Sequence, residues 1–334
     1  MKKTLNRLIN HEKIGEEEAK QVLINISRGD YSPEQIASFL TVYMMRSITV
    51  EELQGFKNAL LELCVSVDFK NYNSIDLCGT GGDGKDTFNI STLSSFITAG
   101  AGVMVTKHGN YGVSSSCGSS NVLESLGVKF TNDIDYLKRS IETTNICILH
   151  APLFHPAMKN VAPIRKALGV KTFFNMLGPM VNPASPKYQL VGVFNLEILR
   201  LYSYLYQKSD KKYSIVHDLG GYDELSLTNN AKIVSNKAEK IFNPEDLGLD
   251  TIHPSSIFGG NSIKKASEIF KTIITGKGTN EHRSTGASSG APTRPEWTVW
   301  SNGRLAMISP SSCRSCAIRA SAGPRPKRLR AAFA

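Results

Sequence analysis

Apolar side chains recur every three or four positions from Leu5 to about Leu63, a spacing typical of α-helices. One stripe begins at Leu5 and a second spans residues 19–26, with Gly29 at its end. Ser32 followed by Pro33 predicts the start of a third helix, and Thr49 predicts the start of a fourth. The pattern therefore predicts a small helical bundle at the N-terminal end of the chain.

From residue 74 onward, short apolar runs alternate with segments of helical periodicity that end at glycines. The apolar runs predict strands over residues 75–77, 103–106, 146–149, 190–194 and 214–216. This alternation is typical of an α/β domain with a mainly parallel central sheet. In such sheets ligands bind at the carboxyl ends of the strands, so the loops that follow the strands are the first places to look for chemistry.

The loop after the first predicted strand carries four glycines between Gly79 and Gly84 and runs into a predicted helix near Asn89. Glycines let a backbone approach a ligand closely, and a helix N-terminus favours anions, so the loop is typical of a phosphate cradle. Its spacing matches neither common nucleotide-binding signature. Taken alone, the loop is equally typical of a tight turn.

The second predicted strand is followed by another loop of the same kind, residues 107–121, which holds a lysine, several hydroxyls and further glycines. A helix beginning near Ser119 would again present backbone amides to an anion. A solvated serine-rich loop is the alternative for either segment. Two such loops at the ends of two strands favour an anion site.

Asp223 and Glu224 follow the strand at residues 214–216, and on a turn both carboxylates could face one ion. Oxygen ligands of this kind suit Mg²⁺ that is shared with substrate phosphates. A solvated surface pair is the commoner reading of adjacent acids. Arg165, among apolar neighbours, is expected on a partly buried helix, where it either pairs with an internal carboxylate or holds a ligand.

The composition favours a globular protein, with 41% hydrophobic residues among 334. The net charge of +10 does not indicate nucleic-acid binding, because residues 279–334 carry +7 of it. We expect no membrane association and a cytoplasmic location, since neither a long apolar run nor a signal peptide is evident. The six cysteines are too scattered for a disulfide framework and are expected to be free thiols.

Four motifs, taken in their order and spacing, closely resemble the anthranilate phosphoribosyltransferase family. They are residues 78–92, residues 107–121, the Asn175-Met176-Leu177-Gly178-Pro179 run with Asn182-Pro183, and residues 221–224. The resemblance covers about residues 5–278. It implies a helical domain over residues 1–70 with added helices from about 155–185, an α/β domain over residues 71–278, and a homodimer.

The resemblance also implies the reaction and its site. The enzymes of this family transfer the 5-phosphoribosyl group of 5-phosphoribosyl 1-diphosphate (PRPP) to the amine of anthranilate in tryptophan biosynthesis, with Mg²⁺ and release of pyrophosphate. Lys107 and Arg165 would be catalytic, Gly79, Asn110 and Arg165 would bind anthranilate, and Ser91, Asp223 and Glu224 would bind the metal. PRPP would lie against Gly79, Gly82, Asp83, Thr87, Asn89, Ile90, Ser91, Thr92, Lys107, His108, Gly109, Asn110, Tyr111, Gly112, Val113, Ser114, Ser115 and Ser119.

Two other functions remain open on the sequence. A pyrimidine nucleoside phosphorylase would share the fold, but the loop Cys78-Gly79-Thr80-Gly81-Gly82-Asp83 departs from the glycine loop of those enzymes. A non-enzymatic relative that binds nucleic acid would be expected to lose the anthranilate contacts, whereas Asn110 and Arg165 are present.

The segment from residue 279 to residue 334 departs from the family. It is rich in Ser, Pro and Arg and lacks apolar periodicity, which is typical of a disordered segment, and both tryptophans of the chain lie in it. A frame change or a foreign fusion near residue 280 would explain this abrupt shift in composition.

Overall fold

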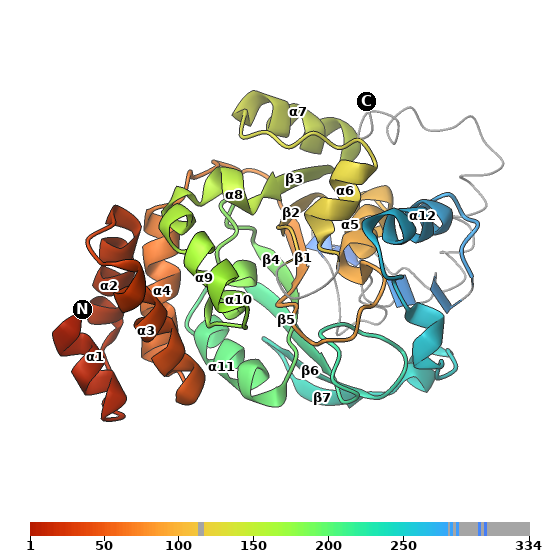
Figure 1. The fold of residues 1–334 in the computed structure, drawn as a ribbon. Helices are drawn as coiled ribbons and strands as arrows, with labels where there is room; N and C mark the ends of the chain where they lie inside the picture. The colour runs from red at the N-terminus through yellow and green to blue at the C-terminus, as the bar shows by residue number, and fades with distance from the viewer. Residues whose placement is uncertain (113–116, 280, 283–284, 287–299, 302–303, 306–334) are drawn as a thin grey trace.

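The computed structural model describes residues 1–112, 117–279, 281–282, 285–286, 300–301 and 304–305. The first four helices form the predicted bundle: α1 (Lys2–Ile9), α2 (Glu16–Arg28), α3 (Pro33–Met45) and α4 (Val50–Glu62). They lie together at one end of the molecule, beside the N-terminus (Figure 1). Within the described residues, no helix is long and apolar enough to cross a membrane.

The ends of these helices follow from local chemistry, as the sequence predicted. Ser32 and Thr49 each accept a hydrogen bond from the backbone N–H three residues on, and Gln35 and Glu52 complete the two capping boxes. Gly29 ends α2 with a φ of +83°, a conformation that glycine adopts without steric cost.

The central sheet has seven strands in the order β3-β2-β1-β4-β5-β6-β7, of which the first five are parallel. They are β1 (Ile75–Gly79), β2 (Val105–Gly109), β3 (Ile146–His150), β4 (Tyr188–Gly192), β5 (Lys212–Asp218), β6 (Ala231–Ser235) and β7 (Glu239–Phe242). The five predicted strands are therefore confirmed, and β6 and β7 add an antiparallel edge that was not predicted. A separate two-stranded ribbon pairs β8 (Trp300–Ser301) with β9 (Arg304–Leu305).

The sheet has its switch point at β1, since β2 and β4 flank β1 on opposite sides. Ligands of open α/β sheets bind outside the carboxyl ends of the strands at such a point. Helices connect most of the parallel strands. They are α5 (Ile90–Gly100), α6 (Ser119–Ser125), α7 (Ile134–Thr144) and α11 (Leu196–Gln207). A later helix, α12 (Ile263–Ile274), packs against α6. Short 3₁₀ helices, η3 (Pro244–Leu247) and η4 (Pro254–Ile257), precede α12.

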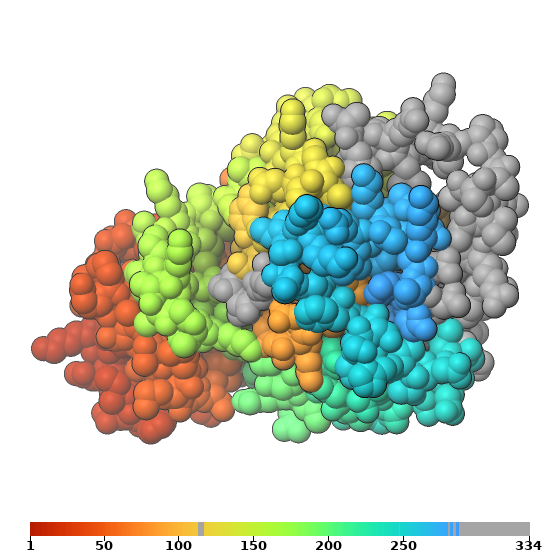
Figure 2. Space-filling model, turned by 45° about the vertical axis from the view of Figure 1, so that its right-hand side comes forward, coloured from red at the N-terminus to blue at the C-terminus, as the bar shows by residue number. Residues whose placement is uncertain are grey.

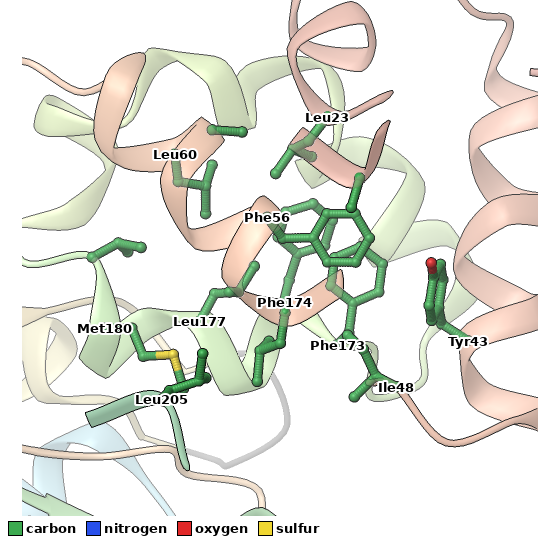
Figure 3. Packing of buried hydrophobic residues seen from close by; sticks show 14 of the residues in the cluster. Leu23, Tyr43, Ile48, Phe56, Leu60, Phe173, Phe174, Leu177, Met180 and Leu205 are labelled. Atoms are coloured by element: carbon green, nitrogen blue, oxygen red, sulfur yellow. The ribbon is translucent and has the colours of Figure 1, made fainter. Parts of the chain in front are cut away.

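Residues 151–180 form a chain of short helices between the bundle and the sheet (Figure 1). These are α8 (Ala151–Phe154), η1 (Pro156–Asn160), α9 (Ala162–Leu168), α10 (Phe174–Leu177) and η2 (Gly178–Met180). Phe173 stacks on Phe56 of α4 with ring centroids 4.4 Å apart, and Tyr43 of α3 packs edge-on against Phe173 at 5.2 Å (Figure 3). Aromatic packing thus joins this segment to the bundle.

A buried ion pair holds the bundle together, and its loss is expected to be costly. Arg46 pairs with Glu52, whose side chain is fully buried and also accepts the N–H of Ile14 at 3.2 Å and of Thr49 at 2.9 Å. Glu52→Ala should lower the free energy of unfolding by about 3 to 5 kcal/mol, because it leaves a buried guanidinium and two donors unpaired. Urea denaturation measures the loss. Glu51→Ala, at an exposed position on the same helix, should lower the free energy of unfolding by less than about 1 kcal/mol. Equal losses of stability in the two variants would contradict the role of the buried ion pair.

Candidate active site

One cleft at the carboxyl ends of β1 and β2 brings together the segments that the sequence singled out. Of the expected site residues, Val113, Ser114 and Ser115 lie outside the described residues. All the others line this cleft: Gly79, Gly82, Asp83, Thr87, Asn89, Ile90, Ser91, Thr92, Lys107, His108, Gly109, Asn110, Tyr111, Gly112, Ser119, Arg165, Asp223 and Glu224. Segments more than a hundred residues apart in the sequence therefore meet at the predicted edge of the sheet.

The first glycine loop leaves β1 and enters α5 at Asn89, the N-cap residue. Gly81, Gly82 and Gly84 have φ values of +65°, +79° and +71°, which side chains disfavour. Thr80 donates its N–H to the carbonyl of Gly192 at 2.9 Å, so the start of the loop is fixed to β4. The loop and the amides at the start of α5 form one wall of the cleft.

The second loop follows β2, and the helix predicted near Ser119 is α6, which begins at that residue. The side-chain oxygen of Asn121 accepts the N–H groups of Gly112 and Gly118, both at 3.0 Å. Ser119 donates its hydroxyl to the carbonyl of Asn110 at 3.3 Å. These bonds hold the two described ends of the loop together at the mouth of the cleft.

Lys107 lines the cleft but is only 2% exposed, and its Nζ donates to the carbonyl of Leu77 at 2.8 Å. Strand β2 runs on through Lys107 and His108, although the apolar run ends at Thr106. The backbone continues the parallel pairing with β3, where Lys107 lies opposite Ile148 and His108 opposite Leu149, and Asp76 also accepts the N–H of His108 at 3.2 Å. Backbone carbonyls, of Leu77 for Lys107 and of Gly178 for His108, thus provide partners for the two polar side chains.

Asp223 and Glu224 place two carboxylates between the glycine loop and α5. Asp223 Oδ2 accepts the N–H of Gly81 at 2.6 Å, and Glu224 Oε1 accepts that of Ser91 at 3.3 Å. A Cβ on Gly79 or on Gly192 would collide with Asp223, so glycine at both positions makes room for the turn.

Burial raises the pKa of both acids, and nearby carboxylates, chiefly Asp83 for Asp223 and Asp223 for Glu224, raise them further. A divalent cation bound between the carboxylates would relieve this repulsion. The described residues contain no group of three or more His, Cys, Asp or Glu side chains able to hold a metal alone. Two carboxylates fit Mg²⁺, which is commonly held by one or two carboxylates together with substrate phosphates.

Arg165 of α9 lies across the cleft and has no carboxylate partner within the described part of the chain. Its guanidinium donates to Oδ1 of Asn175 at 3.1 Å and lies 5.4 Å from the ring centre of Phe174, while its Nε is buried without a hydrogen-bond partner. Burial lowers the pKa of this group, so an anionic partner would be favourable. Of the two alternatives left open by the sequence, an internal carboxylate partner is absent among the described residues, and binding of a ligand remains a prediction.

His108 lines the same cleft as Arg165. Its Nδ1 lies 3.0 Å from the carbonyl oxygen of Gly178, and its ring centroid lies 5.2 Å from that of His155. Burial, followed by the charge of His155, lowers the pKa of His108 to about 3, so the ring is neutral near pH 7. With His108 neutral, Lys107 and Arg165 are the basic side chains among the described residues that line the cleft.

Several cleft residues were not assigned by sequence reasoning. Asn175 and Pro179 belong to a motif that was noted without a role, and Phe174 directly precedes that motif. Only the contact with Arg165 reveals that Asn175 orients it. Gly259 and Gly260 also line the cleft, and their adjacency in the sequence was the one available signal.

Comparisons with known proteins agree with this geometry. Residues 2–64 match the helical bundle domain of a glycosyl transferase family, and residues 71–294 match the a/b domain of that family. An anthranilate phosphoribosyltransferase of Flavobacterium psychrophilum is 65% identical over 279 residues, which is 84% of each chain. A counterpart from Christiangramia forsetii is 64% identical over 278 residues, 83% of this chain and 84% of that one.

Solved structures give the same result. The crystal structure of anthranilate phosphoribosyltransferase from Thermus thermophilus superposes with a TM-score of 0.79 at 32% identity and 86% coverage of both chains. The Saccharomyces cerevisiae enzyme in complex with PRPP and Mg shares the fold with a TM-score of 0.79 at 24% identity, over 86% of this chain and 85% of that one. This chain belongs to the anthranilate phosphoribosyltransferase family.

Proposed function

We propose that the protein transfers the 5-phosphoribosyl group of PRPP to the amine of anthranilate, giving N-(5-phosphoribosyl)anthranilate and pyrophosphate, a step of tryptophan biosynthesis. The observation that carries the proposal is the pairing of two opposite chemistries in one cleft. Two glycine loops and a carboxylate pair form one side, and an arginine without an acidic partner among the described residues forms the other. The first side suits a magnesium pyrophosphate and the second suits a carboxylate.

On the PRPP side, the proposed ligands are the loop and helix-start residues that line the cleft. The amides of the first glycine loop and of α5 would bind phosphate oxygens, and the end of the second loop would close over them. Asp223 and Glu224, with Ser91, would hold Mg²⁺. The bound ion would neutralise charge on the leaving pyrophosphate. Lys107, buried beneath the carboxylates, adds positive charge at the same place.

On the anthranilate side, Arg165 would bind the carboxylate and Asn175 would hold the guanidinium in place. Gly79 and Asn110 would lie against the substrate between Arg165 and the PRPP loops. An aromatic amine is unprotonated near pH 7, so no general base is needed to activate it. Orientation of the amine toward C1 is then the main task of these residues.

The transfer itself calls for little side-chain chemistry. C1 of PRPP can lose pyrophosphate through an oxocarbenium-like transition state, which requires stabilisation of charge on the leaving group and a positioned acceptor. For the first task the cleft offers amides, a lysine and a carboxylate pair that would hold Mg²⁺, and for the second it offers Arg165. No covalent intermediate with the protein is needed.

The remaining expectations stay proposals. We propose two domains, residues 1–70 with helices added from about 155–185, and residues 71–278, in a cytoplasmic homodimer. Apolar side chains on the surface of the bundle offer a contact face, since Ile9 is 61% exposed and Met45 is 79% exposed. Light scattering of the purified protein measures the dimer directly.

A coupled assay tests the function. Purified protein with Mg²⁺ and PRPP should release pyrophosphate only when anthranilate is present, and the fluorescence of anthranilate should fall in equal measure. A nucleoside with inorganic phosphate is the control for a phosphorylase, and a labelled oligonucleotide is the control for a nucleic-acid binder. Phosphorolysis, or release of pyrophosphate that ignores anthranilate, would refute the proposal.

A further inference from the structure

The second half of the first glycine loop is attached to a segment about 170 residues further along the chain. Phe88 donates its N–H to the carbonyl of Ile257 at 3.0 Å, and Gly259 donates its N–H to the carbonyl of Asp86 at 2.8 Å. Thr87 and Phe258 thereby form an isolated antiparallel bridge. Residues around 80–90, in orange, and those before α12, in cyan, lie side by side at the surface (Figure 2).

The contact leaves no room for a side chain at Gly259. A Cβ there would lie 2.6 Å from the carbonyl carbon of Thr87 and 2.7 Å from the backbone nitrogen of Phe88, and it would collide with the Thr87 oxygen. All three are backbone atoms, so a rotamer change cannot relieve the clash. Either the glycine loop or the 257–260 segment would have to move.

The loop has little freedom to move without moving the binding residues. Ile257 is fully buried and Phe88 is 1% exposed, so both sides of the bridge are anchored in the core. Asp86 has a φ of +45°, a left-handed conformation that is uncommon outside glycine but that aspartate tolerates better than most residues. Asn89, the N-cap of α5, follows Phe88 directly. Displacement of the bridge therefore reaches the amides at the start of α5.

We propose that residues 257–260 are a third element of the PRPP site and that Gly259 is a positioning residue within it. The segment holds residues 86–88 so that the amides from Asn89 onward face the phosphate groups. Gly259 and Gly260 also line the cleft, which places the segment at the site itself. The inference rests on the proposed function, since it concerns the binding of PRPP.

Gly259→Ala tests the proposal. The KM for PRPP is expected to rise about tenfold or more, since displacement of binding groups by about 1 Å costs this much, whereas the KM for anthranilate should change less than about twofold. Calorimetric titration with Mg²⁺ and PRPP should show the same loss of affinity without turnover. Gly100→Ala, at the exposed far end of α5 with open space around the glycine, is the matched control and should match the wild type.

The outcomes separate the two claims. A wild-type protein that neither binds PRPP nor forms product would refute the proposed function. An active wild type with a Gly259→Ala variant of unchanged PRPP affinity, or with equal rises in both KM values, would overturn the positioning role alone.

Hydrogen exchange on the wild-type protein covers the case in which Gly259→Ala does not fold. Addition of Mg²⁺ and PRPP should slow exchange in peptides covering residues 84–92 and, together with them, in peptides covering residues 255–262. Peptides from β7 should not change. Protection of residues 84–92 without any change at residues 255–262 would overturn the proposal.

Discussion

Replacement of Arg165 by alanine is expected to raise the KM for anthranilate about 100-fold while the KM for PRPP stays within about threefold. The guanidinium is half-buried, has no acidic partner among the described residues and faces the cleft. Loss of one partner of a hydrogen-bonded charge pair costs about 2 to 5 kcal/mol, and 100-fold corresponds to about 2.7 kcal/mol. Steady-state kinetics with each substrate varied in turn measures both constants.

Two variants define the cause of this effect. Lys166→Ala removes an exposed positive charge from the next position of α9 and should leave both KM values near those of the wild type. Arg165→Lys keeps the charge but loses the fork of donors that matches a carboxylate, so it should recover only part of the affinity. If Arg165→Ala raised the two KM values equally, Arg165 would not be the anthranilate residue.

Local signals account for the parts of the fold that the sequence predicted. Ser32 and Thr49 cap their helices through bonds to residues three positions away, and Gly29 ends α2 by its own backbone conformation. Such features are complete within a few residues, so they can be recognised without tertiary structure. The glycine loops were found for the same reason, and the parallel sheet then placed them at one edge.

The missed features depend on contacts between distant segments. Nothing near Lys107 and His108 in the sequence shows that β2 continues through them, because the pairing that extends the strand is with β3, about 40 residues further along the chain. The role of Asn175 becomes visible only when α10 lies beside Arg165. The lack of space at Gly259 comes from the backbone of Thr87 and Phe88, which lies far away in the sequence. Short-range patterns do not carry such information.

The expectation of an atypical C-terminal segment concerns residues that lie mostly outside the described ones. The described residues before it already contain the cleft with both glycine loops, the carboxylate pair and Arg165. The match to the a/b domain of the family extends to residue 294, beyond residue 278 where the motif resemblance ends. Cys64, Cys78, Cys117 and Cys147 are free thiols, as expected.

Asp223→Asn is expected to lower kcat/KM for PRPP at least about 100-fold at a Mg²⁺ concentration that saturates the wild type. The amide keeps the shape of the side chain and can still accept the N–H of Gly81, but it removes one of the two charges proposed to hold the cation. A bound metal contributes several kcal/mol of charge stabilisation to a transition state, which exceeds the roughly 2.7 kcal/mol needed for 100-fold.

A second readout separates this role from a structural one. Burial and the charge of Asp83 raise the pKa of Asp223, so its ionised form opposes folding when no cation is bound. Without Mg²⁺, Asp223→Asn should therefore unfold at a temperature equal to or above that of the wild type, and Mg²⁺ with PRPP should stabilise it less. Asp210→Asn, at an exposed position, is the control and should change neither activity nor stability. A variant that is less stable without metal would make Asp223 a structural residue. A variant that is stable yet inactive would tie the raised pKa to metal binding. The same burial that penalises the carboxylate alone strengthens its attraction for a cation.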